Sequence, residues 1–247
     1  MRLLKSAVLL LAVGSLFLNG CSRRSEPPMT RALNAAEKGE WLKADKPSEE
    51  AVRSTPDNVN ALILRALVCE RLGRYDEAVE NAYRAVGIDS NSFLPLYTLG
   101  RLYAARPDRR SDAVNLLIKA YRLKGDHPAT LILLCNLNKP GSKYSYLTAL
   151  SRLPGFEKDP ELIFETLMDR VFRGSRKNVP EALQKLFDEN PDNPGLTYAI
   201  GNYFFYCGGA AKRSAARAAY RRYLAFPEKQ RTEKRTAGAV KRLAVLK

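Results

Sequence analysis

The chain has 247 residues, of which 45% are apolar, and it carries a formal net charge of +15. That length suits one large domain or two small ones. The apolar share together with only 15 glycines is ordinary for a globular helical protein and excludes a disordered chain.

The first twenty residues predict an export signal. Arg2 and Lys5 precede an apolar stretch from Ala7 to Leu18, which ends at Asn19-Gly20-Cys21. A basic head, a short apolar run and a small residue before the cut are the parts of a cleaved signal. The run is shorter than the roughly 20 apolar residues that a membrane span needs.

Leu18 to Cys21 resembles the lipobox of bacterial lipoproteins. The resemblance implies that residues 1–20 are removed after Gly20 and that Cys21 becomes a lipid-bearing N-terminus, so this covalent lipid is the only cofactor expected. Ser22 in the next position implies sorting to the outer membrane, with the protein facing the periplasm. Two or three acyl chains hold a protein stably, whereas one holds it only marginally. The alternative is an ordinary secretory signal with a chance cysteine.

Residues 21–28 form a polar tether that ends in two prolines. At about 3.5 Å per residue the tether reaches at most roughly 25 Å. The folded part is therefore expected to work close to the membrane.

Small and ring-bearing residues recur in the next segment at a fixed spacing. Gly39, Trp41, Ala44 and Ala51 are followed 34 residues later by Gly73, Tyr75, Ala78 and Ala85, and Ala32, Ala66 and Gly100 repeat the same step. A period of this size predicts supersecondary units stacked on one another. Such stacks present long surfaces to partners, which favours a binding scaffold over an enzyme.

With Leu99-Gly100 and Tyr103, these residues match the pattern of the tetratricopeptide repeat family, which the chain resembles. The resemblance implies an all-α, right-handed superhelix of about six helix-turn-helix repeats in residues 29–247. Clear repeats are expected at 29–125, degenerate repeats at 126–227 and a capping helix at 228–247. The capping helix is expected to place Ala237, Val240, Leu243 and Ala244 on one packing face and to be polar outside.

In this family the first helix of each unit lines the concave side. Residues one step off the packing rhythm are therefore expected in a peptide-binding groove: Ile63, Leu67, Tyr97, Arg101, Ile132, Asn136, Tyr198 and Asn202. Helix or extended-peptide binding uses such exposed apolar and polar residues. Alternatively, each side chain packs within the superhelix. Ile63 and Leu67 occupy slots that bind a peptide carboxylate in the family's chaperone-binding members, so that clamp is not expected here.

The C-terminal part is strongly basic. Residues 209–247 contain twelve Lys and Arg against two Glu, which is +10 of the +13 left after the signal is removed. The candidate anionic-surface patch consists of Arg217, Arg221, Arg222, Lys229, Arg231, Lys234, Arg235, Lys241 and Arg242. The patch is either a solvated face of the capping helix or a surface for lipid headgroups, cell-wall polymer or an acidic protein. Nucleic acid is not an expected partner of an exported lipoprotein.

Residues for catalysis or metal binding are few. His127 is the only histidine, and one imidazole without further ligands makes no metal site. Gly208 to Ser214 faintly resembles a phosphate loop but lacks its glycine spacing. Cys69, Cys135 and Cys207 are interpreted as buried small hydrophobic residues, although a disulfide between two of them stays open. The sequence therefore predicts neither an enzyme nor a metal site.

Together these features predict a lipid-anchored scaffold for protein–protein interaction in the cell envelope. Lipoproteins of this architecture include assembly factors for outer-membrane proteins and for pili. The alternative is a binder of anionic envelope polymer or lipid that uses the basic C-terminal third.

Overall fold

A computed structural model describes residues 26–207, 209 and 212–246. Within these residues all regular structure is helical and no strand occurs. None of the described helices has the length and apolar character needed to cross a bilayer. The signal at residues 1–20 and the lipid site at Cys21 lie outside the described residues and stay predictions.

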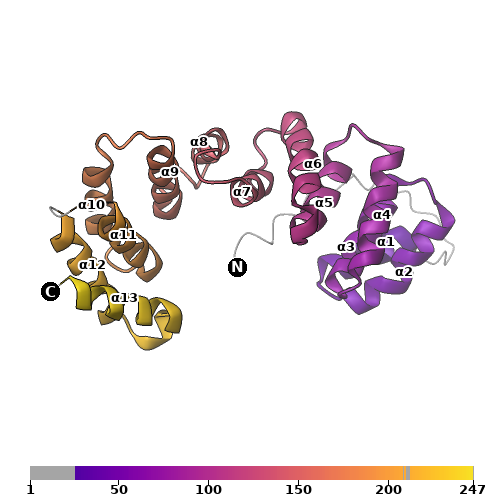
Figure 1. The fold of residues 1–247 in the computed structure, drawn as a ribbon. Coiled ribbons are helices and arrows are strands. Elements are labelled where there is room, and N and C mark those ends of the chain that lie inside the picture. Colours follow the sequence, from indigo (N-terminus) through magenta and orange to yellow (C-terminus); the bar gives the residue numbers. More distant parts are fainter. Residues whose placement is uncertain (1–25, 208, 210–211, 247) are drawn as a thin grey trace. The chain divides into compact units, whose positions relative to one another are not determined.

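The helices follow one another as six antiparallel pairs and a final single helix (Figure 1). The pairs are α1 (Pro28–Glu37) with α2 (Trp41–Ser54), α3 (Val59–Arg71) with α4 (Tyr75–Ile88), α5 (Phe93–Ala104) with α6 (Arg110–Leu123), α7 (Pro128–Leu137) with α8 (Tyr144–Ser151), α9 (Pro160–Phe172) with α10 (Val179–Glu189), and α11 (Pro194–Tyr206) with α12 (Arg213–Ala225). The final helix is α13 (Glu233–Val245), and single 3₁₀ turns precede α6 (η2, Pro107–Arg109) and α13 (η4, Glu228–Gln230). The prediction of six helix-turn-helix units and a last helix is confirmed.

The chain divides into two compact units, the first ending at Lys124 and the second beginning at Gly125. The first unit contains helices α1 to α6, and the second contains helices α7 to α13.

Glycines end the first helix of several pairs. Gly73 adopts a φ of +79° directly after α3, a left-handed conformation that costs glycine little. The chain then reverses, and the Arg74 amide donates to the Cys69 carbonyl at 2.8 Å. Gly39 repeats this with a φ of +73°, so the 34-residue glycine spacing marks the turn inside each of the first two pairs.

Asparagine and aspartate caps start the first helices. The Asn58 side chain accepts from the Asn60 and Ala61 amides at 2.9 and 3.1 Å. Asn193 caps α11 in the same way, with the Leu196 amide at 2.9 Å. These caps satisfy amides that the first helical turn would leave without a partner. The related segments Pro56-Asp57-Asn58 and Pro191-Asp192-Asn193 thus mark the boundary between successive pairs.

Two helical glycines allow the helices of a pair to approach closely. A Cβ atom on Gly100 of α5 would lie 3.0 Å from Leu117 Cγ of α6. A Cβ atom on Gly201 of α11 would lie 3.0 Å from Tyr220 Cε1 of α12. Real side chains essentially never tolerate tighter contacts, so glycine at these positions sets the spacing inside the pairs.

The fourth pair departs from the regular pattern. Its second helix, α8, has only eight residues, and the turn before it contains Gly141 with a φ of +88°. Asp169 of α9 fixes this turn, because its Oδ1 accepts from the Gly141 amide at 2.7 Å and from the Lys143 amide at 3.2 Å. The buried carboxylate therefore compensates for the irregular sequence of the turn.

The final helix packs against α11 and α12 with an unexpected face. Gly238 lies so close to Tyr198 that a Cβ atom would be 2.5 Å from its hydroxyl, and Ala239 is fully buried. The predicted packing face is wrong, because Ala237, Val240 and Ala244 are exposed. The expected polar outer surface is present only in part, since Val240 is 55% exposed beside the exposed Lys234 and Lys241. Helix α13 approaches on its glycine side because only there can it contact the Tyr198 ring closely.

Candidate functional site

Ile63 does not line an open groove. It is 7% exposed and belongs to a core cluster that includes Leu62 and Ala85. Leu67, one turn later on α3, is half-buried. The prediction that Ile63 faces a groove is therefore wrong. Its side chain packs between helices instead, as the alternative for these residues predicts.

Tyr97 and Arg101 of α5 are engaged by their neighbours. The Tyr97 ring stacks on Phe93 with centroids 5.5 Å apart and is half-buried, and this burial raises the pKa of Tyr97. Both terminal nitrogens of Arg101 contact the Glu70 carboxylate of α3, one of them at 2.6 Å. The Arg101 guanidinium therefore joins two first helices, and its charge is already neutralised.

The four predicted groove residues of the second unit differ in their exposure and hydrogen bonds. Ile132 is half-buried and Asn136 is exposed on α7. The Asn202 side chain accepts from the Tyr220 hydroxyl at 2.9 Å, and the Tyr198 hydroxyl accepts from Arg242 at 2.9 Å. Asn136 is thus the one predicted groove residue that is fully exposed.

Two exposed aromatic side chains were not among the predicted groove residues. Phe172, the last residue of α9, is 65% exposed, and Tyr206, the last residue of α11, is 66% exposed. The two residues are 34 positions apart, so they occupy the same place on neighbouring first helices. This 34-residue spacing is the sequence signal from which the two residues could have been predicted as a pair. Aromatic residues are common anchors at protein interfaces, and these two recur at the repeat spacing.

Contacts with neighbouring residues position the Tyr206 ring. Arg242 of α13 donates from Nε and Nη2 to the Tyr206 hydroxyl at 3.2 and 3.1 Å. The Phe205 ring meets the Tyr206 ring edge-on at 4.9 Å between centroids. Phe172 lies beside Gly141, where a Cβ atom on the glycine would be 3.5 Å from Phe172 Cβ. The Tyr206 ring, held in this way, loses little conformational freedom when a partner binds.

A small hollow opens beside Phe172. It measures about 180 Å³ and is lined by Pro140, Lys143, Glu165, Met168, Asp169 and Phe172. Lys143 Nζ forms an ion pair with Glu165 at 3.3 Å. Asp169 Oδ2 is buried 3.2 Å from Arg173 Nε without hydrogen-bond geometry, so this interaction is purely electrostatic. The hollow offers apolar walls and charges of both signs next to the exposed ring.

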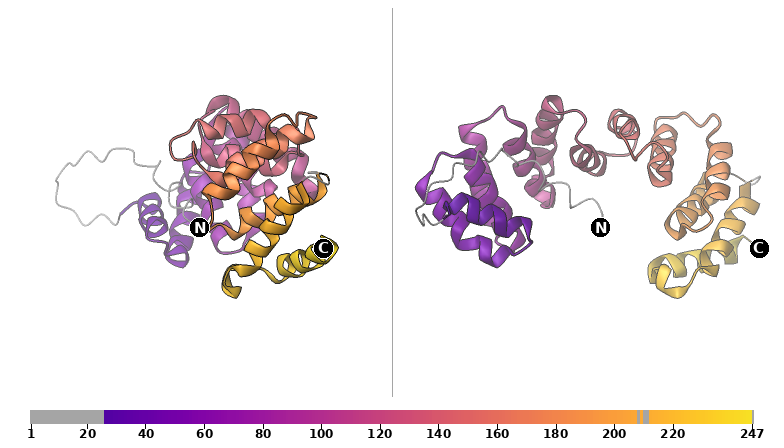
Figure 2. Two further views of the ribbon diagram at one scale, coloured as in Figure 1. Left: turned by 90° about the vertical axis from the view of Figure 1, so that its left-hand side faces the viewer. Right: turned by 180° about the vertical axis from the view of Figure 1, so that it is seen from behind.

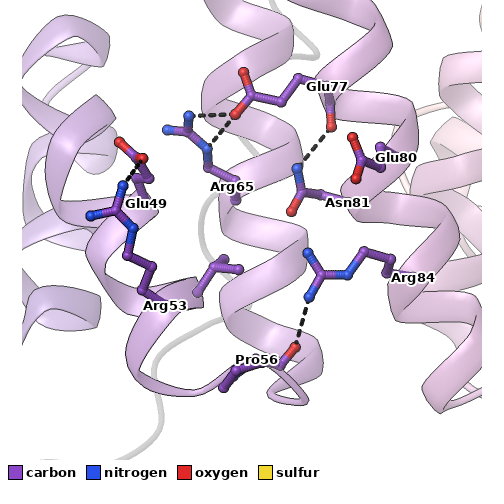
Figure 3. A pocket seen from close by; sticks show the side chains of 9 residues that line it. Glu49, Arg53, Pro56, Arg65, Glu77, Glu80, Asn81 and Arg84 are labelled. Carbon is purple, nitrogen blue, oxygen red and sulfur yellow. Dashed lines mark hydrogen bonds and ion pairs between the residues drawn. The ribbon is translucent and has the colours of Figure 1, made fainter.

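The first unit has a different hollow, on its second helices (Figure 3). It measures about 450 Å³ and is lined by Glu49, Val52, Arg53, Pro56, Arg65, Glu77, Glu80, Asn81 and Arg84. Glutamates and arginines alternate along the walls, and Glu49 pairs with Arg53 at 2.6 Å. With charges so balanced, the hollow selects no particular ligand charge.

The Arg65 guanidinium forms the floor of this hollow. The residue is 5% exposed, and its Nη1 donates to Asp45 Oδ1 at 2.7 Å and to Ser48 Oγ at 3.1 Å. Nε donates to Glu77 Oε1 at 2.9 Å. Arg65 therefore ties α2, α3 and α4 together through one buried cation.

The two acids of this network respond to the arginines around them. Burial alone would raise the pKa of Asp45, but hydrogen bonds from Arg74 and Arg65 hold it below its usual value. The pKa of Glu77 is lowered in the same way, chiefly by Arg65. Both carboxylates are therefore ionised when the first unit is folded at neutral pH.

The comparisons with known proteins bear on the fold. No protein-family model matches the chain, and no curated protein matches its sequence. Among solved structures, YrrB, described as a TPR protein with an unusual peptide-binding site, aligns with a TM-score of 0.62 at 17% identity over 78% of this chain and 97% of that one. A tetratricopeptide repeat protein from Parabacteroides merdae aligns at 0.61 and 16% identity over 89% and 91% of the two chains. MamA from AMB-1 aligns at 0.55 and 15% identity over 66% and 98%.

The chain has the tetratricopeptide-repeat fold. Its six helix pairs are the repeats, and α13 stands where the first helix of a seventh would begin. None of these three similar structures is described as an enzyme. In this fold Phe172 and Tyr206 both belong to the first helices of their pairs.

The basic patch predicted at the C-terminal end of the repeats divides into two groups. Arg217, Arg222 and Arg242 donate to neutral oxygens of Leu246, Phe187 and Tyr206, and Arg231 is half-buried. The exposed group consists of Arg221, Lys229, Lys234, Arg235 and Lys241. Arg213, which was not in the predicted patch, is exposed as well.

Cysteine and histidine residues serve the repeats structurally. Cys69 and Cys135 are buried as interpreted from the sequence, whereas Cys207 is exposed, so that interpretation is wrong for Cys207; all three are free thiols. Burial raises the pKa of Cys69 to about 12 and that of Cys135 to about 11, so both stay protonated. His127 caps α7, with Nδ1 accepting from the Thr130 amide at 3.3 Å. No group of three or more metal-binding side chains occurs among the described residues.

Proposed function

We propose that the chain is a membrane-anchored scaffold that binds a segment of a partner protein along first helices α9 and α11. The observation that supports this most strongly is the pair of exposed rings, Phe172 and Tyr206, at equivalent positions of adjacent repeats. Rings presented at repeat spacing fit an apolar peptide that runs across the two helices. The proposal is supported by YrrB, a protein of this fold that is described as having a peptide-binding site. The chain acts through binding and not through catalysis.

The anchoring part of the proposal depends on Cys21 and on where the folded chain starts. Arg31 Nε donates to the Glu26 carbonyl at 3.1 Å, and Asn34 Nδ2 donates to Glu26 Oε1 at 3.1 Å. Glu26 is thus bound to α1, which leaves Ser22 to Ser25 as the tether. Four residues span about 14 Å at most. A lipid on Cys21 would therefore hold the first repeat at the membrane surface of the cell envelope, where an assembly factor for envelope proteins works.

Lipid attachment at Cys21 is tested by metabolic labelling with an alkyne-tagged palmitate. The full chain is expected to take up label and to fractionate with membranes, whereas Cys21→Ser loses both, because that cysteine carries the acyl chains. Cys207→Ser, which removes an exposed free thiol, is the matched control and is expected to keep both. Labelling that persists in Cys21→Ser would refute the anchor.

Partner binding is tested with a photo-crosslinking amino acid placed at position 172 or 206 in living cells. Both sites are expected to capture the same protein, because the two rings lie on adjacent first helices. Position 83 is the control, since Tyr83 is 65% exposed but belongs to the second helix α4. Capture at position 83 alone, or of unrelated proteins at 172 and 206, would contradict the proposed binding face.

A further inference from the structure

The charge of the chain is concentrated in its last two described helices. Residues 26–207 contain 25 Lys and Arg and 24 Asp and Glu, a formal charge of +1. Residues 212–246 contain eleven Lys and Arg and two Glu, a formal charge of +9. The repeats are thus nearly neutral up to α11, and helices α12 and α13 with the η4 turn carry nearly the whole excess.

The cations of this segment also form no ion pair with an acidic group of the described residues. The ion pairs of the described residues all lie between Arg31 and Glu189. In the first unit eight Lys and Arg residues pair with carboxylates, whereas none of those between 212 and 246 does. Six of them are exposed: Arg213, Arg221, Lys229, Lys234, Arg235 and Lys241. Unpaired cations at this density repel one another and favour an anionic partner.

The outer surface of α13 combines these cations with apolar side chains. Val240 is 55% and Val245 is 72% exposed, and Ala237 and Ala244 are exposed next to them. Lys234 and Lys241, which are seven positions apart, lie on the same exposed face. The opposite face packs on the last repeat. An exposed helical face of apolar residues bordered by lysines is typical of helices that lie at a membrane interface.

We propose that α12, the η4 turn and α13 form a surface that contacts an anionic phospholipid bilayer. The helices α12 and α13 lie side by side in every view (Figures 1 and 2), so their cations belong to one end of the second unit. A second copy of the chain does not fit this surface, because two segments of +9 would repel each other. An acidic peptide would leave the exposed valines without a partner, whereas a bilayer interface accepts both the cations and the valines.

The expected strength follows from the exposed cations. Each Lys or Arg close to an anionic bilayer strengthens binding about fivefold, provided it lies within a Debye length of roughly 8 Å. Because the side chains are long and form no ion pair with another described residue, they reach headgroups without breaking an ion pair. The binding is therefore expected to weaken strongly with salt, and it requires no lipid on Cys21.

The test is vesicle sedimentation with non-lipidated protein, residues 22–247, which keeps every described residue. The protein is expected to bind phosphatidylcholine vesicles that contain phosphatidylglycerol, and to bind pure phosphatidylcholine at least about tenfold less. A variant with Arg213, Arg221, Lys234 and Lys241 all changed to Gln is expected to lose at least about tenfold in binding. None of these four side chains has an ion pair to lose, so the thermal unfolding of the variant should match that of the wild type.

A charge-matched control variant distinguishes binding through this surface from an effect of the net charge of the whole protein. Lys38, Lys46, Lys119 and Lys158 are exposed elsewhere in the repeats, and changing these four to Gln is expected to leave vesicle binding within about twofold. Equal losses in the two variants, or equal binding to neutral and anionic vesicles, would overturn the proposal. Binding to polyglutamate or an anionic polysaccharide without binding to vesicles would also overturn it and assign the surface to that polymer.

Discussion

Replacing Arg65 by methionine is expected to destabilise the first unit by about 3 kcal/mol, because this removes one partner of a buried ionic network. The guanidinium connects three helices, and its loss leaves Ser48 Oγ without the donor from Arg65, while the Asp45 carbonyl keeps the Ser48 hydroxyl as a side-chain donor. The two carboxylates are about one-third exposed and keep Arg74 as a partner, which places the effect at the low end for buried pairs. Methionine fills much of the volume, so the loss comes from the network and not from a cavity.

Denaturant unfolding monitored at Trp41 measures this change within the first unit. Trp41 is the single tryptophan of the chain and packs against the core of the first repeat. Arg53→Met is the matched control, because Arg53 lines the same hollow but is 76% exposed in its pair with Glu49. Arg53→Met is expected to lower the free energy of unfolding by about 0.5 kcal/mol or less. Equal midpoints for the two variants would show that Arg65 does not hold the three helices together.

The dependence of stability on pH in the acid range provides a second measurement of the same network. Asp45 and Glu77 have folded pKa values below their ordinary values of 3.8 and 4.5, so their ionisation stabilises the folded state above those values. That contribution is lost as the pH falls through the folded pKa values. The wild type should therefore lose stability below about pH 4.5, whereas Arg65→Met should depend less steeply on pH in this range.

Replacing Gly100 by leucine is expected to destabilise the first unit by about 2 to 3 kcal/mol. The Cβ atom alone would lie 3.0 Å from Leu117 Cγ and 3.2 Å from Leu116 Cβ, and the rest of the side chain would have to enter the α5–α6 contact. Leucine favours the helical conformation by close to 1 kcal/mol over glycine, which offsets only part of the cost. The two helices must separate to accommodate the new side chain.

Gly87 provides the control for helix propensity. It lies inside α4, and a Cβ atom there would meet no neighbour within 4 Å. Gly87→Leu is therefore expected to stabilise the first unit slightly. The unfolding midpoint measured by Trp41 fluorescence should rise for Gly87→Leu and fall for Gly100→Leu. A stabilising Gly100→Leu would contradict close packing as the reason for glycine at that position.

The repeat architecture could be predicted because its signals are local. Gly39 and Gly73 end helices whatever surrounds them, and the turn at Pro56-Asp57-Asn58 caps the next helix by itself. Such positions recur every 34 residues because successive helix pairs turn and pack in the same way. The pattern fades after residue 125, yet the pairs continue, since Asp169 replaces a regular turn with a contact from the next pair.

The side-chain environments could not be predicted from spacing alone. Helical periodicity placed Ile63 one step off the packing rhythm, but α3 is covered so completely that this side chain is buried too. Arg65 is the single charge in the apolar run from Ala61 to Cys69, but only the arrangement of α2 and α4 around it reveals its partners in a buried network. For α13, the face that packs depends on Gly238 meeting Tyr198, a tertiary contact that the pattern of apolar residues does not encode.

The binding face on α9 and α11 is tested most directly by the affinity of the partner captured at positions 172 and 206. Replacing Phe172 and Tyr206 together by alanine is expected to weaken binding at least about 100-fold, as for two interface hot spots. Tyr83→Ala, which removes an equally exposed ring from α4, should leave the affinity within about twofold. An affinity that the double variant leaves unchanged, or that Tyr83→Ala weakens equally, would contradict binding along the first helices.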